Sequence, residues 1–255
     1  MQVYFAPLEG VTDSIYRRAH HAMFGGVEKY FIPFISPSES LTFSSREQRA
    51  IDPRENAGVP VVPQLLTRDA GRFVAMTKLL SDCGYREVNL NLGCPSGTVT
   101  AKGKGSGMLR DLGALRAFLD AIFASSALPI SIKTRIGYQS IDEWGALLEL
   151  LNAYPASEMI VHMRTKAEFY RGHAHRELCA ATMETLRAPF VYNGDLFTIE
   201  DLRAFESECP NARAVMLGRG LIANPALAET FAGGETLSRQ QRQTAGAQQS
   251  QTAQR

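Results

Sequence analysis

The stretch AVMLGRG, residues 214–220, decides between two folds for this chain. It is a short apolar run followed at once by a glycine-flanked turn, and it is the last of eight such runs. Most of the runs are continuously apolar, as strands buried on both faces are, and helical periodicity follows them. The expected strands are residues 3–6, 27–31, 59–62, 87–90, 130–133, 159–162, 190–192 and 214–217.

Eight βα units in 255 residues match the length of a (β/α)8 barrel, which is typically about 250 residues. A doubly wound open sheet is the alternative, and the count of eight is what argues against it. The expected helices are residues 13–23, 69–82, 112–123, 141–153, 177–186 and 198–206. Thr198 and Asp201 have the spacing of a capping box at the start of the last of these.

The composition of the chain indicates where the barrel ends. We predict an α/β fold, a TIM barrel over residues 1–232, and a polar, disordered tail over residues 233–255. Pro63 is expected to mark the end of the third strand, because proline cannot donate to a strand ladder. Residues 33–58 are rich in Pro, Ser, Arg and Glu and are expected to form a long loop over the strand ends.

Charge and composition exclude several classes of protein. The chain is 45% hydrophobic, with 27 Lys and Arg against 26 Asp and Glu, so it is neither disordered nor globally basic. Any polyanion must therefore be bound by a local patch. The four cysteines have no paired spacing, and no leader or run of 18 apolar residues occurs, which favours a cytoplasmic protein without a membrane segment.

Polar residues follow almost every predicted strand, where the active site of a parallel barrel lies. Amides, basic groups and an imidazole at one mouth are typical of a site for a planar polar ligand that carries a phosphate. Asn193-Gly194-Asp195 and Gly218-Arg219-Gly220 follow the seventh and eighth strands, where barrels commonly bind phosphate. The alternative is that these glycines only make tight turns.

A cysteine stands directly after the fourth strand. A lone cysteine is usually a packing residue, but Cys94 lies between Gly93 and Pro95 at a strand end, which favours a catalytic role. The glycine-rich run 103–107 lacks the ending of a phosphate-binding P-loop, and we expect a mobile lid there. His173, His175 and Cys179 have a weak spacing for a metal, so no metal site is predicted.

Five blocks in register resemble the tRNA-dihydrouridine synthase family. The resemblance runs in order from about residue 4 to residue 225, and its most specific part is the cysteine block with the glycine-rich run after it. It implies a barrel that uses FMN and NADPH to reduce the C5=C6 bond of uridine in tRNA. The blocks are APLEGVTD (residues 6–13), NLGCP (91–95), KTRIG (133–137), HMRT (162–165) and NGD (193–195).

The resemblance also implies roles for individual residues. Cys94 would be the acid that protonates C5, because an ordinary thiol is mostly protonated at neutral pH. The substrate contacts would be Asn91, Lys102, Arg135 and Arg164. The FMN contacts would be Pro7, Leu8, Glu9, Gln64, Lys133, His162, Asn193, Gly194, Asp195, Gly218 and Arg219.

One departure from the family bears on the partner. Similar members generally continue into a helical domain that grips tRNA, whereas this chain passes into the polar tail, so we expect a short form with weak affinity for tRNA. Two alternatives stay open: a flavin-dependent reductase of small pyrimidines or activated alkenes, and a catalytically weakened remnant that contacts RNA.

Overall fold

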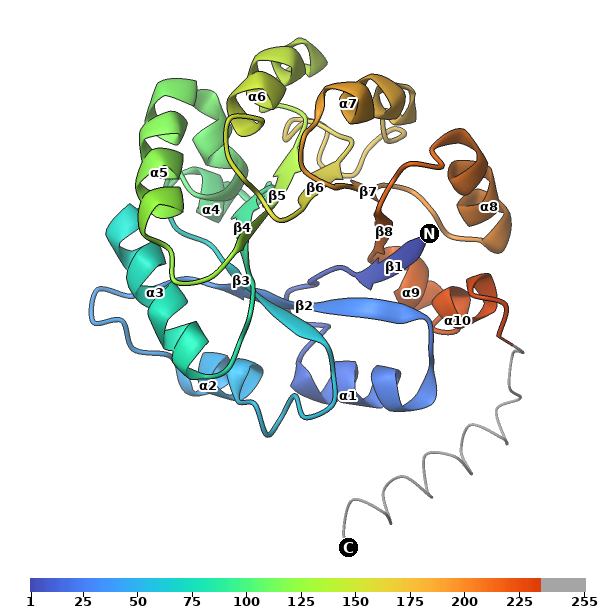
Figure 1. Cartoon of the computed structure of the whole chain (residues 1–255), viewed down its shortest axis with the longest axis horizontal. Helices are drawn as coiled ribbons and strands as arrows, with labels where there is room; N and C mark the ends of the chain where they lie inside the picture. Colours follow the sequence, from blue (N-terminus) through green and yellow to red (C-terminus); the bar gives the residue numbers. More distant parts are fainter. Residues whose placement is uncertain (235–255) are drawn as a thin grey trace, which may run out of the picture.

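The computed structural model, which describes residues 1–234, is a closed barrel of eight parallel strands in chain order with helices outside it (Figure 1). The first and last strands pair from Gln2↔Ala214 to Phe5↔Leu217, which closes the barrel and excludes the open sheet. The fold prediction is thus confirmed. The strands are β1 (Gln2–Phe5), β2 (Val27–Ile35), β3 (Val61–Leu65), β4 (Val88–Leu92), β5 (Ile130–Arg135), β6 (Met159–His162), β7 (Phe190–Asn193) and β8 (Ala214–Leu217).

Side-chain hydrogen bonds cap the N-termini of most of the long helices. Aspartate side chains cap α1, α3 and α5, and the predicted capping box of Thr198 and Asp201 is confirmed at α8. The helices are α1 (Ser14–Met23), α2 (Ser45–Ile51), α3 (Ala70–Asp82), α4 (Gly97–Thr100), α5 (Leu112–Ser125), α6 (Trp144–Leu151), α7 (Cys179–Thr185), α8 (Ile199–Glu208), α9 (Arg219–Ala223) and α10 (Leu227–Phe231). Short 3-10 helices are η1 (Gly105–Arg110), η2 (Ile141–Glu143) and η3 (Arg176–Leu178). Within residues 1–234, no helix is long and apolar enough to span a membrane.

Two sequence expectations around β2 and β3 are wrong. Residues 33–58 are not one loop, because the first three extend β2 and a capping box at Ser44 starts α2. Pro63 does not end β3 but lies inside it. The ladder to β2 becomes irregular just after Ile32↔Pro63, and pairing with β4 begins only at Gln64, so the missing N–H of Pro63 costs little.

The barrel interior has two chemically different sides. Apolar side chains from β1, β2, β3, β6, β7 and β8 form one cluster: Tyr4, Ala6, Phe31, Val62, Ile160, Val191, Ala214 and Met216. From Gln64 onward, β3, β4 and β5 contribute buried amides and a serine instead. A separate, larger core packs the strands against the helices. The predicted tail from residue 235 onward lies outside the described residues, and the domain boundary stays a prediction.

Candidate active site

Two adjoining cavities lie at the carboxyl ends of the strands. One, of about 80 Å³, reaches the loops after β7 and β8, and the other, of about 160 Å³, reaches the loop after β4. Both are lined by Pro7, Leu8, Lys133, His162 and Tyr170. The smaller cavity also contacts Asn193, Gly194, Gly218 and Arg219, and the larger also contacts Glu9, Gln64, Asn91, Cys94 and Arg135. Most of the residues predicted from seven separate strands therefore meet at one place.

Lys133 stands where the two cavities join. In the barrel register it neighbours Asn91 on one side, and its Nζ donates to Asn193 Oδ1 at 2.9 Å. Burial lowers the Lys133 pKa to about 7, with the nearby Arg135 guanidinium adding to the effect. No carboxylate pairs with this ammonium in the described part of the chain. The site thus holds an amine that is about half protonated near neutral pH, and an anionic ligand would favour its charged form.

A chain of neutral hydrogen bonds fixes the loop after β4. Asn91 Nδ2 donates to Gln64 Oε1 at 2.7 Å, Gln64 Nε2 donates to Asn89 Oδ1 at 2.7 Å, and Asn89 Nδ2 donates to Ser131 Oγ at 2.9 Å. Asn91 Oδ1 is then free to accept from the backbone N–H groups of Gly93 and Cys94, at 3.0 and 2.9 Å. The amides therefore hold Cys94 in place through its own backbone.

Cys94 lines the larger cavity as a protonated thiol. Burial raises its pKa, although Arg135 and Lys133 pull in the other direction. Ser106 supports the loop from below, because its backbone N and its Oγ both donate to the Cys94 carbonyl, at 3.2 and 2.8 Å. A Cβ at Gly105 would lie 3.0 Å from Cys94 Cβ. The expectation of a mobile lid at residues 103–107 is wrong, since Gly105 to Leu109 are buried in η1 beneath the cysteine.

The glycines beside the smaller cavity differ in how much space surrounds them. A Cβ at Gly194 would lie 2.0 Å from Tyr192 Oη, and one at Gly220 would lie 2.4 Å from the Leu196 carbonyl oxygen. A side chain at either position would therefore collide with its neighbours, which is a packing requirement; neither glycine has the positive φ that would point to a special turn conformation. A Cβ at Gly218 meets only ordinary contacts at 3.5 Å, yet this residue lines the cavity.

Behind the cavity wall, one carboxylate holds two guanidinium groups. Asp195 accepts from Arg164 Nη2 and, at 2.8 Å, from Arg219 Nη2. Arg164 is 1% exposed and also donates to the carbonyls of Arg171 and Gly172, at 3.2 and 2.7 Å. Neither Asp195 nor Arg164 lines either cavity, in contrast to the contacts predicted for them. Asp195 instead positions Arg219, and Arg164 positions the loop after β6.

His162 is a neutral, buried imidazole in the shared wall. Burial and the surrounding cations Arg135, Lys133 and Arg164 lower its pKa well below the usual range. Its Nε2 faces Arg164 Nη1 at 3.3 Å, so Nε2 is the acceptor and the ring proton is on Nδ1. The Nε2 atom of His162 therefore accepts a hydrogen bond from Arg164 and cannot donate a proton to the site.

The remaining predicted residues have different environments. Arg135 is 1% exposed, and its guanidinium donates to the carbonyls of Gly93, Thr165 and Phe169 at 2.8 to 2.9 Å while it lines the larger cavity. Glu9 reaches the rim and pairs with Arg46 at 2.9 Å. Lys102 is exposed in the turn after α4 and lines neither cavity.

Sequence reasoning missed the aromatic side of the site. Tyr170 lines both cavities, is 55% exposed, and lies 5.9 Å from the His162 ring and 5.3 Å from the Arg219 guanidinium. It also missed Asn89 and Ser131 in the amide chain. The signal for these two was polar residues inside an otherwise apolar strand.

The chain matches a known protein family and several of its members. The family described as "Dihydrouridine synthase (Dus)" matches residues 4–254. The chain is 32% identical over 241 residues to "tRNA-dihydrouridine(16) synthase" of Pseudomonas syringae pv. tomato, covering 91% of this chain and 75% of that one. It is 32% identical over 236 residues to "Probable tRNA-dihydrouridine synthase" of Staphylococcus epidermidis, covering 86% and 68%.

Solved structures resemble the fold at much lower identity. A variant of NCR from Zymomonas mobilis superposes with a TM-score of 0.61 at 14% identity, over 96% of this chain and 90% of that one. Morphinone reductase gives a TM-score of 0.61 at 13% identity, over 93% and 87%. At such identities, the likeness concerns the barrel alone.

Proposed function

This chain belongs to the dihydrouridine synthase family, and we propose that it reduces the C5=C6 bond of uridine in tRNA to dihydrouridine, with FMN as cofactor and NADPH as hydride source. The observation that carries the proposal is the pairing of two groups in one cavity. Cys94 is a thiol whose pKa burial raises, and Lys133 is an amine with a pKa of about 7 that has no carboxylate partner among the described residues, so an anionic ligand would favour its charged form. A proton donor beside an uncompensated positive charge suits reductive chemistry on an anionic cofactor.

The residues fit a flavin nucleotide. Lys133 would balance negative charge on the ring, and Gln64 would reach its polar edge from the same cavity. The ring and ribityl chain would also contact Pro7, Leu8, His162 and Asn193, and the phosphate would contact Gly194, Gly218 and Arg219. Asp195 would act on the phosphate through Arg219, which its carboxylate holds. When bound and reduced by NADPH, FMN would supply the hydride that is added to uracil C6.

The proton comes from this chain. Reduction of the double bond needs one proton at C5 in addition to the hydride, and the Cys94 thiol would donate it. The thiolate left behind would lie close to the positive charges of Arg135 and Lys133, which favour it electrostatically. A proton from solvent then restores the thiol. Asn91 keeps the cysteine loop in one position through these steps.

The tRNA substrate is supported by the family and by the names of its similar members. A small pyrimidine would reach the same cavity, so the experiment has to separate the two. Purified protein with FMN and NADPH is incubated either with unmodified tRNA transcript or with free uridine monophosphate, and dihydrouridine is quantified by liquid chromatography and mass spectrometry. We expect product in the tRNA reaction. Reduction of the free nucleotide without reduction of tRNA would favour the small-molecule reductase, and no product from a flavin-loaded protein would contradict both.

A further inference from the structure

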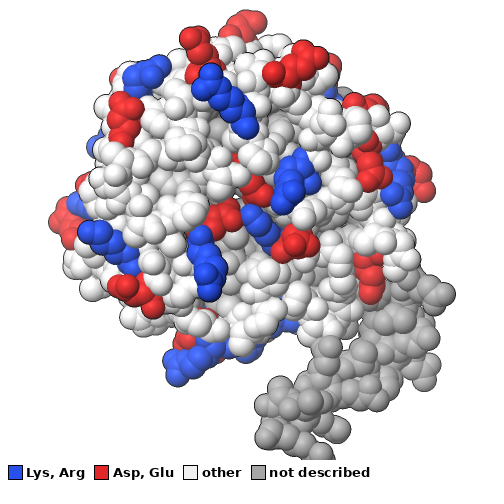
Figure 2. Space-filling view, in the orientation of Figure 1, with Lys and Arg blue, Asp and Glu red and all other residues white. Residues whose placement is uncertain are grey.

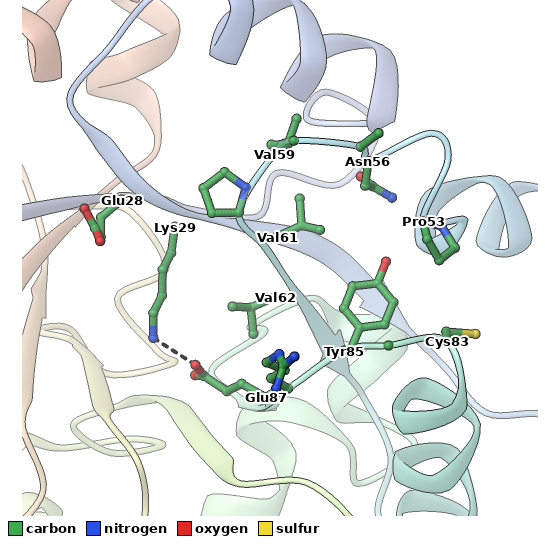
Figure 3. Close-up of a pocket in the computed structure, with 15 residues that line it drawn as sticks. Glu28, Lys29, Pro53, Asn56, Val59, Val61, Val62, Cys83, Tyr85 and Glu87 are labelled. Carbon is green, nitrogen blue, oxygen red and sulfur yellow. Dashed lines mark hydrogen bonds and ion pairs between the residues drawn. The ribbon is translucent and has the colours of Figure 1, made fainter.

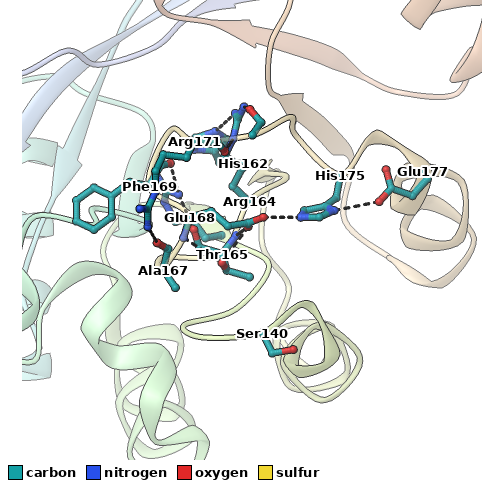
Figure 4. Close-up of polar contacts among 12 residues, drawn as sticks. Ser140, His162, Arg164, Thr165, Ala167, Glu168, Phe169, Arg171, His175 and Glu177 are labelled. Carbon is teal, nitrogen blue, oxygen red and sulfur yellow. Dashed lines mark hydrogen bonds and ion pairs between the residues drawn. The ribbon is translucent and has the colours of Figure 1, made fainter.

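A histidine closes the loop between β6 and η3 on itself. The backbone N–H of His175 donates to the Met163 carbonyl at 2.7 Å, so residues 163–175 form a ring-shaped loop. The side chain of His175 then bridges two carboxylates (Figure 4). Its Nε2 is 2.7 Å from Glu168 Oε1, and its Nδ1 is 3.0 Å from Glu177 Oε1. The imidazole thus joins the middle of the loop to the start of the helical segment after it.

This bridge requires a protonated imidazole. A neutral ring has one donor and one acceptor nitrogen, whereas a carboxylate can only accept, so both contacts are satisfied only by the cation. The other oxygen of Glu168 accepts from the backbone N and the Oγ1 of Thr165, at 2.6 and 2.9 Å. The charge on His175 is therefore connected through Glu168 to the first residues of the loop.

The surrounding charges support the same protonation state. Partial burial lowers the pKa of His175, but the hydrogen bonds and negative charges of Glu168 and Glu177 outweigh it and raise that pKa. The neighbouring cation Arg176 is directed elsewhere, with its Nε 2.7 Å from Glu208 and its guanidinium over the Phe205 ring. From α8 and η3, no further charge contacts the imidazole among the described residues.

The loop that this bridge closes is strained and carries part of the active-site wall. Phe169 has φ of 56°, a left-handed conformation that a bulky side chain rarely adopts. Its carbonyl accepts from Arg135 Nη1 at 2.8 Å, and the next residue is Tyr170, which lines both cavities. Such a conformation persists only when several contacts hold it, and His175 supplies contacts at the far side of the loop.

We propose that His175 is a positioning residue, which in its protonated form clamps Glu168 and Glu177 and thereby holds Tyr170 against the substrate cavity. Tyr170 then offers an exposed ring, 5.5 Å from the Arg135 guanidinium, as the wall against which the uracil ring and its flanking nucleotide are placed. The effect on substrate rests on the proposed function, whereas the clamp itself does not.

The pH dependence has a definite sign. The folded-state pKa of His175 lies above its unfolded value near 6.5, so the clamp is complete below that pH and is lost as the pH rises through the folded value. The pKa values of Glu168 and Glu177 are lowered, so their part is lost only in acid, as the pH falls through those lowered values. The loop should therefore be most ordered in mildly acidic solution and should loosen in mildly alkaline solution.

Hydrogen exchange tests the clamp without reference to catalysis. Amide exchange of residues 165–172, corrected for intrinsic rates, is measured by mass spectrometry at pH 6 and pH 8.5 in the wild type, His175→Gln and the matched control His173→Gln. His173 is exposed on the same loop. We expect protection in the wild type and the control to fall several-fold between pH 6 and pH 8.5. His175→Gln should already be low at pH 6 and should not change.

Equal protection in His175→Gln and His173→Gln, or wild-type protection that is independent of pH, would overturn the proposal. A second measurement follows KM for tRNA and the rate of flavin reduction by NADPH in the same variants. We expect KM to rise several-fold in His175→Gln while the rate of flavin reduction stays within about twofold. If the protein does not act on tRNA, the exchange experiment still decides the question of the clamp.

Discussion

The two ends of the barrel each hold a lysine on a strand, yet the surroundings of the two ammonium groups are opposite. At the amino ends of the strands, Lys29 Nζ lies 2.8 Å from Glu87 (Figure 3). It also lies 2.9 Å from Glu158, and Tyr4 Oη donates to the Glu158 carboxylate at 2.6 Å. At the carboxyl ends, Lys133 faces an amide oxygen. The ammonium group at one end is therefore neutralised by carboxylates, and the amine at the other end has no carboxylate partner among the described residues.

Cavity size alone would have pointed to the wrong end. The cavity beside Lys29 measures about 530 Å³, against about 80 and 160 Å³ for the two at the other end. Its walls are largely apolar, and its lysine is already paired. Acidic and basic side chains are also interspersed on the face in Figure 2. Uncompensated charge and a protonated thiol, rather than volume, distinguish the candidate active site.

The largest contrast should come from the cysteines of the two ends. Cys94→Ala should lower uridine reduction by 10² to 10⁴, roughly 3 to 5 kcal/mol, because general acid catalysis is lost. Cys83→Ala is the matched control, since Cys83 lines the cavity at the opposite end. Single-turnover reduction of tRNA measures the effect, and flavin content should be the same in both variants. A rate in Cys94→Ala equal to that of the control would assign the cysteine to packing.

Replacing each of the two lysines by methionine should separate an effect on stability from an effect on flavin binding. Lys29→Met leaves two largely buried carboxylates facing each other and should lower the free energy of unfolding by about 2 to 3 kcal/mol. Lys133→Met should change it by less than about 1 kcal/mol, because no carboxylate loses a partner, but should weaken FMN binding. Urea denaturation and a flavin titration give the two numbers. The comparison fails if Lys133→Met is the less stable variant.

Proton uptake should mark the unpaired lysine. With a pKa of about 7, Lys133 is mostly neutral at pH 8 in the flavin-free protein, and an anionic ligand favours its protonated form. FMN binding at pH 8, where the phosphate is already fully ionised, should therefore take up close to one proton. Calorimetry in buffers of different ionisation enthalpy measures this uptake. The uptake at pH 8 should vanish in Lys133→Met and remain in Lys29→Met.

The smallest effect concerns the carboxylate behind the wall. Asp195→Asn removes the charge that orients Arg219, so the preference for FMN over riboflavin should fall by about three- to tenfold, or roughly 1 kcal/mol. Affinities for the two flavins are compared by fluorescence quenching. An equal loss for both flavins would mean that Asp195 acts on the ring side rather than on the phosphate.

Much of the fold and the strand-end chemistry could be predicted because both depend on short-range patterns. The runs at residues 159–162 and 214–217 match β6 and β8 residue for residue. Register then explains why Arg135, His162 and Asn193 stand side by side at the mouth, since they are partners on neighbouring strands. Residues at the ends of neighbouring parallel strands lie close together whatever the conformation of the loops that follow.

What the sequence did not predict depends on long-range contacts. Tyr170 lies eight residues after His162, and its place is set by guanidinium groups from β5 and the loop after β6. The run 103–107 was predicted to be a mobile lid because it is rich in glycine, but Gly105 and Gly107 are buried in η1, and Gly105 allows close packing against Cys94. The place of Pro63 inside β3 could not be predicted either, because it depends on the irregular pairing with the neighbouring strand β2.

The bonds made by Asn91 have one more consequence. Its side-chain oxygen accepts from both backbone N–H groups at the tip of the loop, those of Gly93 and Cys94. Neither N–H can then serve as an oxyanion hole, the arrangement by which many enzymes stabilise a developing negative charge on a carbonyl oxygen. Negative charge that develops on a uracil carbonyl beside this loop is therefore not stabilised by these two N–H groups, whereas the side chains of Lys133 and Arg135 line the same cavity.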